Sequence, residues 1–211
     1  MWNYFGTDSA FHKYGSLVFD IILISLLWLV CSLPLITIGA ATTATYYVST
    51  KKIAKREGYI LSDFFKSFKQ NFIKATLLFI FILLFGYVLV TNMGALAIGF
   101  SLSGGLYIVQ IYAFFQLTCI SIYAFAILSR FELSLLSVIR ASFTLANRHI
   151  FSTLTCMALV ITTVMATFYV PIFSMLAGGV YIYVSSYFLI KVFAKHYEGF
   201  DVLEDEKEEG I

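Results

Sequence analysis

The sequence predicts an all-α protein: a polytopic helical membrane bundle of about five transmembrane helices, with a proline-broken first helix and two basic amphipathic interfacial helices. Of its 211 residues, 60% are hydrophobic and only 12% are charged, whereas soluble domains carry about 25% charged residues. Apolar runs of membrane length alternate with short segments that hold most of the Lys and Arg. We therefore expect one helical membrane domain over residues 1–195 and an acidic, disordered tail over residues 196–211.

The first apolar run is too long for a single straight crossing. It starts near Leu17 and becomes clearly polar only at Ser49, whereas a bilayer core needs about 20 helical residues. Pro34 lies near its middle, so we expect a break between Ser32 and Thr37, followed by a short half-helix of small residues and threonines. Non-helical backbone at membrane depth must be satisfied by protein or by water, so the break should be buried in the bundle. A proline-kinked helix with no further role is the simpler interpretation.

The residues around this break are the first candidate site, formed by Pro34, Thr37 and Gly39. Broken helices line the substrate path in many transporters, usually together with polar or charged groups at mid-membrane. Here the nearby polar groups are only hydroxyls, which also bond to helix carbonyls or to neighbouring helices. We expect that structural role, with a small-solute path past Pro34 as the alternative.

Two basic segments have the spacing of amphipathic helices. In the first, Leu61 to Lys74, the residues expected on the apolar face are Leu61, Phe64, Phe65, Phe68 and Phe72. In the second, Arg130 to His149, the apolar residues are Leu136, Ile139 and Phe143, with Ile150 after them. The candidate partner or lipid surface consists of Lys66, Lys69, Lys74, Arg140 and Arg148. Attraction to anionic headgroups is sufficient to explain it, and docking of a protein partner is the sharper alternative.

Four further spans follow, over residues 72–92, 106–128, 150–169 and 172–193. The connections after the first and third spans contain basic residues, and the other two connections contain no charge. The positive-inside rule then places both basic connections in the cytoplasm of a cell-membrane protein. Five crossings put the N-terminus outside and the C-terminus inside, provided that the half-helix after Pro34 completes the first crossing.

Residue patterns for catalysis are missing from the sequence. His12, His149 and His196 have no second His or Cys at ligand spacing, and there is no glycine-rich phosphate loop. We expect no enzyme activity, no cofactor, no metal and no nucleic-acid partner. Asp20 is the only carboxylate in the first apolar run, and an interfacial charge is favoured there over an ion or proton site.

Two stretches resemble the YesL family of bacterial integral membrane proteins, which is also described as a domain of unknown function. The first is Trp28-Leu29-Val30-Cys31-Ser32-Leu33-Pro34-Leu35-Ile36-Thr37-Ile38-Gly39-Ala40. The second is Phe64-Phe65-Lys66-Ser67-Phe68-Lys69-Gln70-Asn71-Phe72. The length and the order of spans are also similar to that family, so the resemblance extends over nearly the whole chain.

The resemblance implies a function outside catalysis. Members of the YesL family are often encoded near carbohydrate importers of the ATP-binding cassette (ABC) type, which implies an accessory role in sugar uptake. The chain lacks the Glu-Ala-Ala loop by which importer permeases engage their ATPases, which disfavours the permease role itself. The expected partners are therefore the lipid bilayer and ABC importer subunits, and the alternative function is a small-solute transporter or channel.

Overall fold

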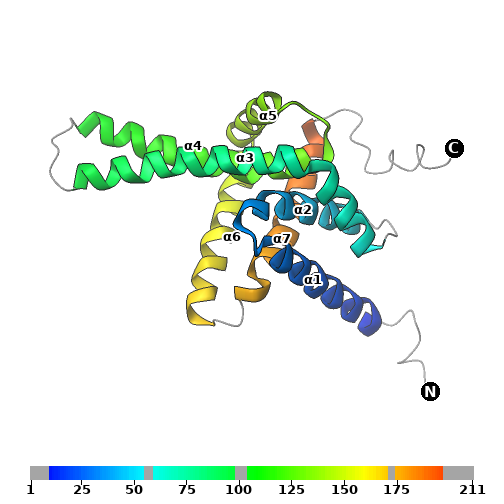
Figure 1. Cartoon of the computed structure of the whole chain (residues 1–211). Coiled ribbons are helices and arrows are strands. Elements are labelled where there is room, and N and C mark those ends of the chain that lie inside the picture. The colour runs from blue at the N-terminus through cyan, green and yellow to red at the C-terminus, as the bar shows by residue number, and fades with distance from the viewer. Residues whose placement is uncertain (1–9, 55–58, 98–103, 171–173, 197–211) are drawn as a thin grey trace, which may run out of the picture.

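The computed structural model describes residues 10–54, 59–97, 104–170 and 174–196, and every element within them is helical. The elements are α1 (Ala10–Ser32), η1 (Leu35–Thr37), α2 (Ile38–Ile53), α3 (Ile60–Ala97), α4 (Gly104–Arg130), α5 (Leu135–Arg148), α6 (Ile150–Tyr169) and α7 (Ser174–His196) (Figure 1). Five of these helices, α1, α3, α4, α6 and α7, are long and apolar enough to cross a membrane. The predicted all-α fold with about five spans is confirmed. The acidic tail after His196 lies outside the described residues.

The first apolar run forms a hairpin, because α2 turns back along α1. Lys52 Nζ lies 2.7 Å from Asp20 Oδ2, and Trp28 Nε1 donates a hydrogen bond to Thr42 Oγ1 at 3.2 Å. In both pairs, one residue precedes the Pro34 break and its partner follows the break at a similar distance along the chain, which is the register of two antiparallel helices. The half-helix therefore returns toward the end from which α1 started, and does not complete the crossing that the five-span count assumed.

The break itself lies at the tip of this hairpin and is exposed. Leu33 and Leu35 are each 74% exposed, and Pro34 between them is also exposed. The expectation of a break buried in the bundle is wrong, because residues 33–36 are all exposed.

The returning helix α2 is the centre of the bundle. Ten of its 16 residues are buried: Gly39, Ala40, Ala41, Thr43, Ala44, Thr45, Tyr46, Val48, Ser49 and Thr50. It packs against α1, α3, α4 and α7. Small side chains allow neighbouring backbones to approach closely inside a membrane. Because its residues are small, α2 can pack closely against all four neighbours. Its hydropathy is low for a buried membrane helix, because it contains many threonines and small residues.

The first basic segment continues without interruption into the second span as the 38-residue helix α3. Neither Pro nor Gly occurs between residues 60 and 85 to end the helix. The aromatic face that the sequence predicted is only partly used for contact with the rest of the protein. Phe64 and Ser67 are buried, whereas Leu61, Phe65 and Phe72 are exposed. The buried stripe therefore includes a hydroxyl, and three of the five predicted apolar positions face outward.

The remaining helices pack in antiparallel order. Gln110 Nε2 donates to the Leu89 carbonyl at 2.8 Å across α3 and α4, and Tyr123 Oη lies 3.0 Å from Thr153 Oγ1 across α4 and α6. The outer halves of α3 and α4 extend together away from the other helices (Figure 1). The second basic segment is a separate helix, α5, whose first turn is capped by Ser134 as it accepts from the Ser137 N–H.

Candidate functional site: the basic end of the bundle

One end of the bundle gathers the charged residues, and we call it the basic end. It is the end at which α2, α4 and α7 finish and α3 and α6 begin. Arg130, the last residue of α4, donates from Nε to Thr50 Oγ1 at 2.8 Å and lies 5.3 Å from the ring centroid of Tyr47. Phe131 and Phe193 stack edge to face, with ring centroids 6.0 Å apart. The end of α4 is thus attached both to α2 and to α7.

Each carboxylate within the described residues has a partner at this end. Asp20 pairs with Lys52, and Asp63 Oδ1 lies 3.1 Å from Lys51 Nζ. Glu132 Oε1 accepts a hydrogen bond from Gln70 Nε2 at 3.0 Å. The Asp20 side chain is 15% exposed, and its pairing fits the interfacial charge that the sequence favoured. The two ion pairs connect α1 to α2 and α2 to α3, so their first role is to hold the end together.

The predicted basic surface divides into two parts. Lys66 and Lys69 lie exposed on the first turns of α3, and Arg140 and Arg148 lie exposed on α5. Lys74 differs, because its Nζ donates to the Leu133 carbonyl at 3.4 Å and so joins α3 to the α4–α5 connection. The structure therefore brings all five predicted cations to the basic end but gives Lys74 a structural contact.

The surface of α5 has three sectors. Its buried side consists of Val138, Ser142, Leu145 and Ala146, which face a bundle contact made chiefly with α4. Next to this side are the apolar residues Leu136 and Phe143, 70% and 47% exposed. The third sector carries Arg140, Thr144, Asn147 and Arg148. Such a helix meets protein, hydrocarbon and water on three successive faces, which is the pattern of an in-plane membrane helix.

The residues of the Pro34 break serve the fold. Thr37 Oγ1 donates to the carbonyls of Cys31, at 2.5 Å, and Pro34, at 2.7 Å. A Cβ added to Gly39 would meet the Ala75 carbonyl oxygen and would lie 2.7 Å from Phe79 Cβ. The hydroxyls of Thr43 and Thr45 donate to carbonyls one turn earlier in α2. These contacts match the structural role that the sequence favoured for the hydroxyls.

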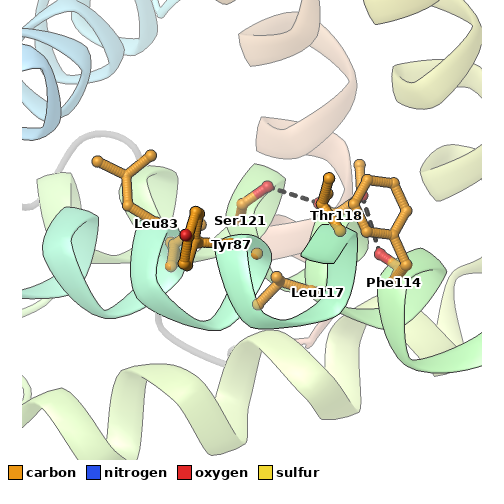
Figure 2. A pocket seen from close by; sticks show the side chains of 9 residues that line it. Leu83, Tyr87, Phe114, Leu117, Thr118 and Ser121 are labelled. Carbon is orange, nitrogen blue, oxygen red and sulfur yellow. Dashed lines mark hydrogen bonds between the residues drawn. The ribbon is translucent and has the colours of Figure 1, made fainter. Parts of the chain in front are cut away.

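A groove that the sequence analysis did not predict lies between the outer halves of α3 and α4 (Figure 2). Its volume is about 430 Å³, and it is lined by Ile82, Leu83, Gly86, Tyr87, Val90, Phe114, Leu117, Thr118 and Ser121. The two α4 hydroxyls are already bonded, because Ser121 donates to the Thr118 carbonyl and Thr118 to that of Phe114. The groove thus offers an almost wholly apolar surface. Its only sequence signal is Gly86 within an otherwise bulky run.

Comparison with known families finds a similarity over the hairpin and α3. Residues 21–93 match a family described as "Protein of unknown function, DUF624". The DUF624 match covers about half of α1, all of α2 and most of α3, including the Gly39 contact and both Lys51 and Lys52. Neither the curated proteins nor the solved structures include a match to the chain. Within the described residues, no three His, Cys, Asp or Glu side chains are grouped to hold a metal ion.

Proposed function

We propose that this protein is a non-enzymatic accessory component of a membrane complex, which it binds through the first four turns of α3. The observation that carries the proposal is an exposed mixed surface on those turns. Leu61 is 51% exposed, Phe65 42% and Phe72 36%, and the exposed Lys66 and Lys69 lie between them. Exposed aromatic residues beside cations are typical of protein interfaces.

The length of α3 supports a location for this surface outside the hydrocarbon. Its 38 residues correspond to about 57 Å of helix, whereas the bilayer core is about 30 Å thick. The excess is about 18 residues, which matches the stretch from Ile60 to Phe72 with a short margin at the other end. These turns are therefore available to a partner from the aqueous side.

The resemblance to the YesL family supports a particular partner, a carbohydrate importer of the ABC type. In this proposal the protein lies in the cell membrane, contacts the bilayer along its spans, and binds importer subunits at the basic end. Cofactors and nucleic acids have no part in it. The transporter alternative is not proposed, because the Thr37 hydroxyl and the Gly39 surface on which it depended are engaged in packing.

The docking proposal predicts a loss of importer subunits when the α3 cations are reversed. The full chain, expressed from its native locus, is purified in mild detergent as the parent, as Lys66→Glu/Lys69→Glu, and as Arg140→Glu/Arg148→Glu. The two double variants carry the same charge change at the same end of the bundle. We expect the α3 variant to lose at least about tenfold of the co-purified importer subunits, because like charges would then oppose the partner surface, and the α5 variant to retain them. Absence of importer subunits from the parent, or an equal loss in both variants, would contradict the proposal.

The hairpin leads to a further proposal on topology, that both termini are cytoplasmic. Because α2 returns along α1, α1 begins and α7 ends at the basic end, which the positive-inside rule places in the cytoplasm. We expect epitope tags before Met1 and after Ile211 to be accessible on the same face of oriented vesicles, and a tag inserted between Ala97 and Gly104 on the other face. Accessibility of the two terminal tags from opposite faces would restore the five-crossing arrangement and refute this topology.

A further inference from the structure

The position of α5 is fixed by the two membrane-length helices that it joins. α4 ends at Arg130 and α6 begins at Ile150, immediately after His149. The two helices are neighbours, as the Tyr123–Thr153 hydrogen bond shows. Their adjoining ends therefore lie at the same face of the bilayer. The 14 residues of α5, about 21 Å long, must remain near that boundary, unlike the first turns of α3, which exceed the length of the bilayer core.

The outward residues of α5 are arranged for such a boundary. Leu136 and Phe143 are seven residues apart, two turns along one stripe, and Ile150, 51% exposed, continues it at the start of α6. Arg140 lies beside this stripe, and Arg148 lies two turns further along, at the other edge of the polar sector. An apolar stripe with flanking arginines fits the region where acyl chains meet phosphate groups. Guanidinium groups bind phosphate oxygens through paired hydrogen bonds.

Within the described residues, neither Arg140 nor Arg148 forms an ion pair with a carboxylate. Asp20 and Asp63 are each paired with a lysine of α2, and Glu132 accepts from Gln70. These three are the only carboxylates within the described residues. From this charge pattern and the position of α5, we propose that α5 is a binding site for anionic phospholipids. In this site, Arg140 and Arg148 bind headgroup phosphates, and Leu136 and Phe143 enter the upper acyl region.

This lipid site is separate from the docking surface on α3 and goes beyond the accessory function. It is tested in nanodiscs that contain equal amounts of phosphatidylcholine and phosphatidylglycerol. In each sample the acyl chains of one of the two lipids carry bromine, which quenches tryptophan fluorescence. The reporter is Phe143→Trp, and the signal of the parent chain, from Trp2 and Trp28, is subtracted. The reporter is placed in four backgrounds: the native arginines, Arg140→Gln/Arg148→Gln, Arg140→Lys/Arg148→Lys, and Lys195→Gln as a cation at the end of α7.

We expect brominated lipid to quench the reporter, with phosphatidylglycerol favoured over phosphatidylcholine. A basic residue at an anionic surface contributes about 1 kcal/mol, or about a fivefold preference. The Gln pair should therefore lose the preference, whereas the Lys pair and the Lys195 variant should retain most of it. Retained quenching in the Gln pair would also show that the variant is still folded and inserted.

Two results would overturn the lipid site. Equal quenching by both lipids with the native arginines would mean that α5 has no preference for anionic headgroups. Absence of quenching by either lipid would mean that Phe143 faces water or a protein partner. Neither result bears on the α3 surface, because importer capture is measured separately with the Lys66 and Lys69 variants.

Discussion

Replacement of Gly39 by leucine is expected to lower the free energy of unfolding by about 3 kcal/mol. A Cβ at this position meets the backbone oxygen of Ala75 and the Cβ of Phe79. Backbone cannot move aside as a flexible side chain can, so α2 would have to separate from α3. The contact lies beside the start of the central helix, and separation there would loosen the packing of α2 against its other neighbours. Thermal or denaturant unfolding of the purified protein in mild detergent measures the change.

Gly94→Leu is the matched control, because an added Cβ at Gly94 meets no atom within 4 Å. Both changes place the same side chain on a helical glycine, and we expect the control to unfold at the parent temperature or slightly above it, since glycine is a weak helix former. Equal stability of the two variants would show that α2 and α3 are not packed as closely as described here. A stable Gly39→Leu protein that lost solute flux in proteoliposomes would instead favour the transport path near Pro34.

The composition of the chain was enough to predict the class of fold. Apolar runs of membrane length, separated by basic segments, leave few alternatives to a helical bundle. Pro34 also placed the break within the correct few residues. The direction of α2 after the break could not be predicted, because its local residues would suit a helix running either way. The hairpin depends on contacts between distant residues, such as Trp28 with Thr42 and Asp20 with Lys52.

The five cations of the candidate surface lie at one end of the bundle, but the sector of each helix that meets protein could not be predicted. Sequence patterns equate apolar residues with the buried side, which holds when the solvent is water. In a bilayer the solvent is also apolar, so Leu136 can face outward. Small hydroxyl residues then enter the protein contact: Ser67 and Ser142 are buried, and Ser142 donates to the Val138 carbonyl at 2.7 Å. The spacing of apolar residues was enough to predict the helices. The side of each helix that contacts the rest of the protein became known only from the packing in the structure.

Substitutions at Trp28 and Gly178 are expected to have strongly non-additive effects on the free energy of unfolding. A Cβ on Gly178 would lie 2.5 Å from Cε3 of the Trp28 ring, so α7 approaches α1 where the indole covers a bare backbone. Trp28→Ala should cost about 3 kcal/mol, because it leaves a cavity and removes the hydrogen bond to Thr42. Gly178→Ala should cost about 2 kcal/mol, because its methyl group would overlap the ring.

The double variant distinguishes this contact from two independent defects. With the indole removed, the methyl group at position 178 enters the space that the ring leaves, so the double change should cost at least about 1 kcal/mol less than the sum of the single changes. Gly15→Ala, on the same helix as Trp28 and with no atom near its added Cβ, should combine additively with Trp28→Ala. Unfolding measurements on the four Trp28 and Gly178 proteins and on the Gly15 pair give both coupling energies. Additivity at Gly178 would show that the indole does not contribute to the α1–α7 contact, and would limit the role of Trp28 to its hydrogen bond with Thr42 in α2.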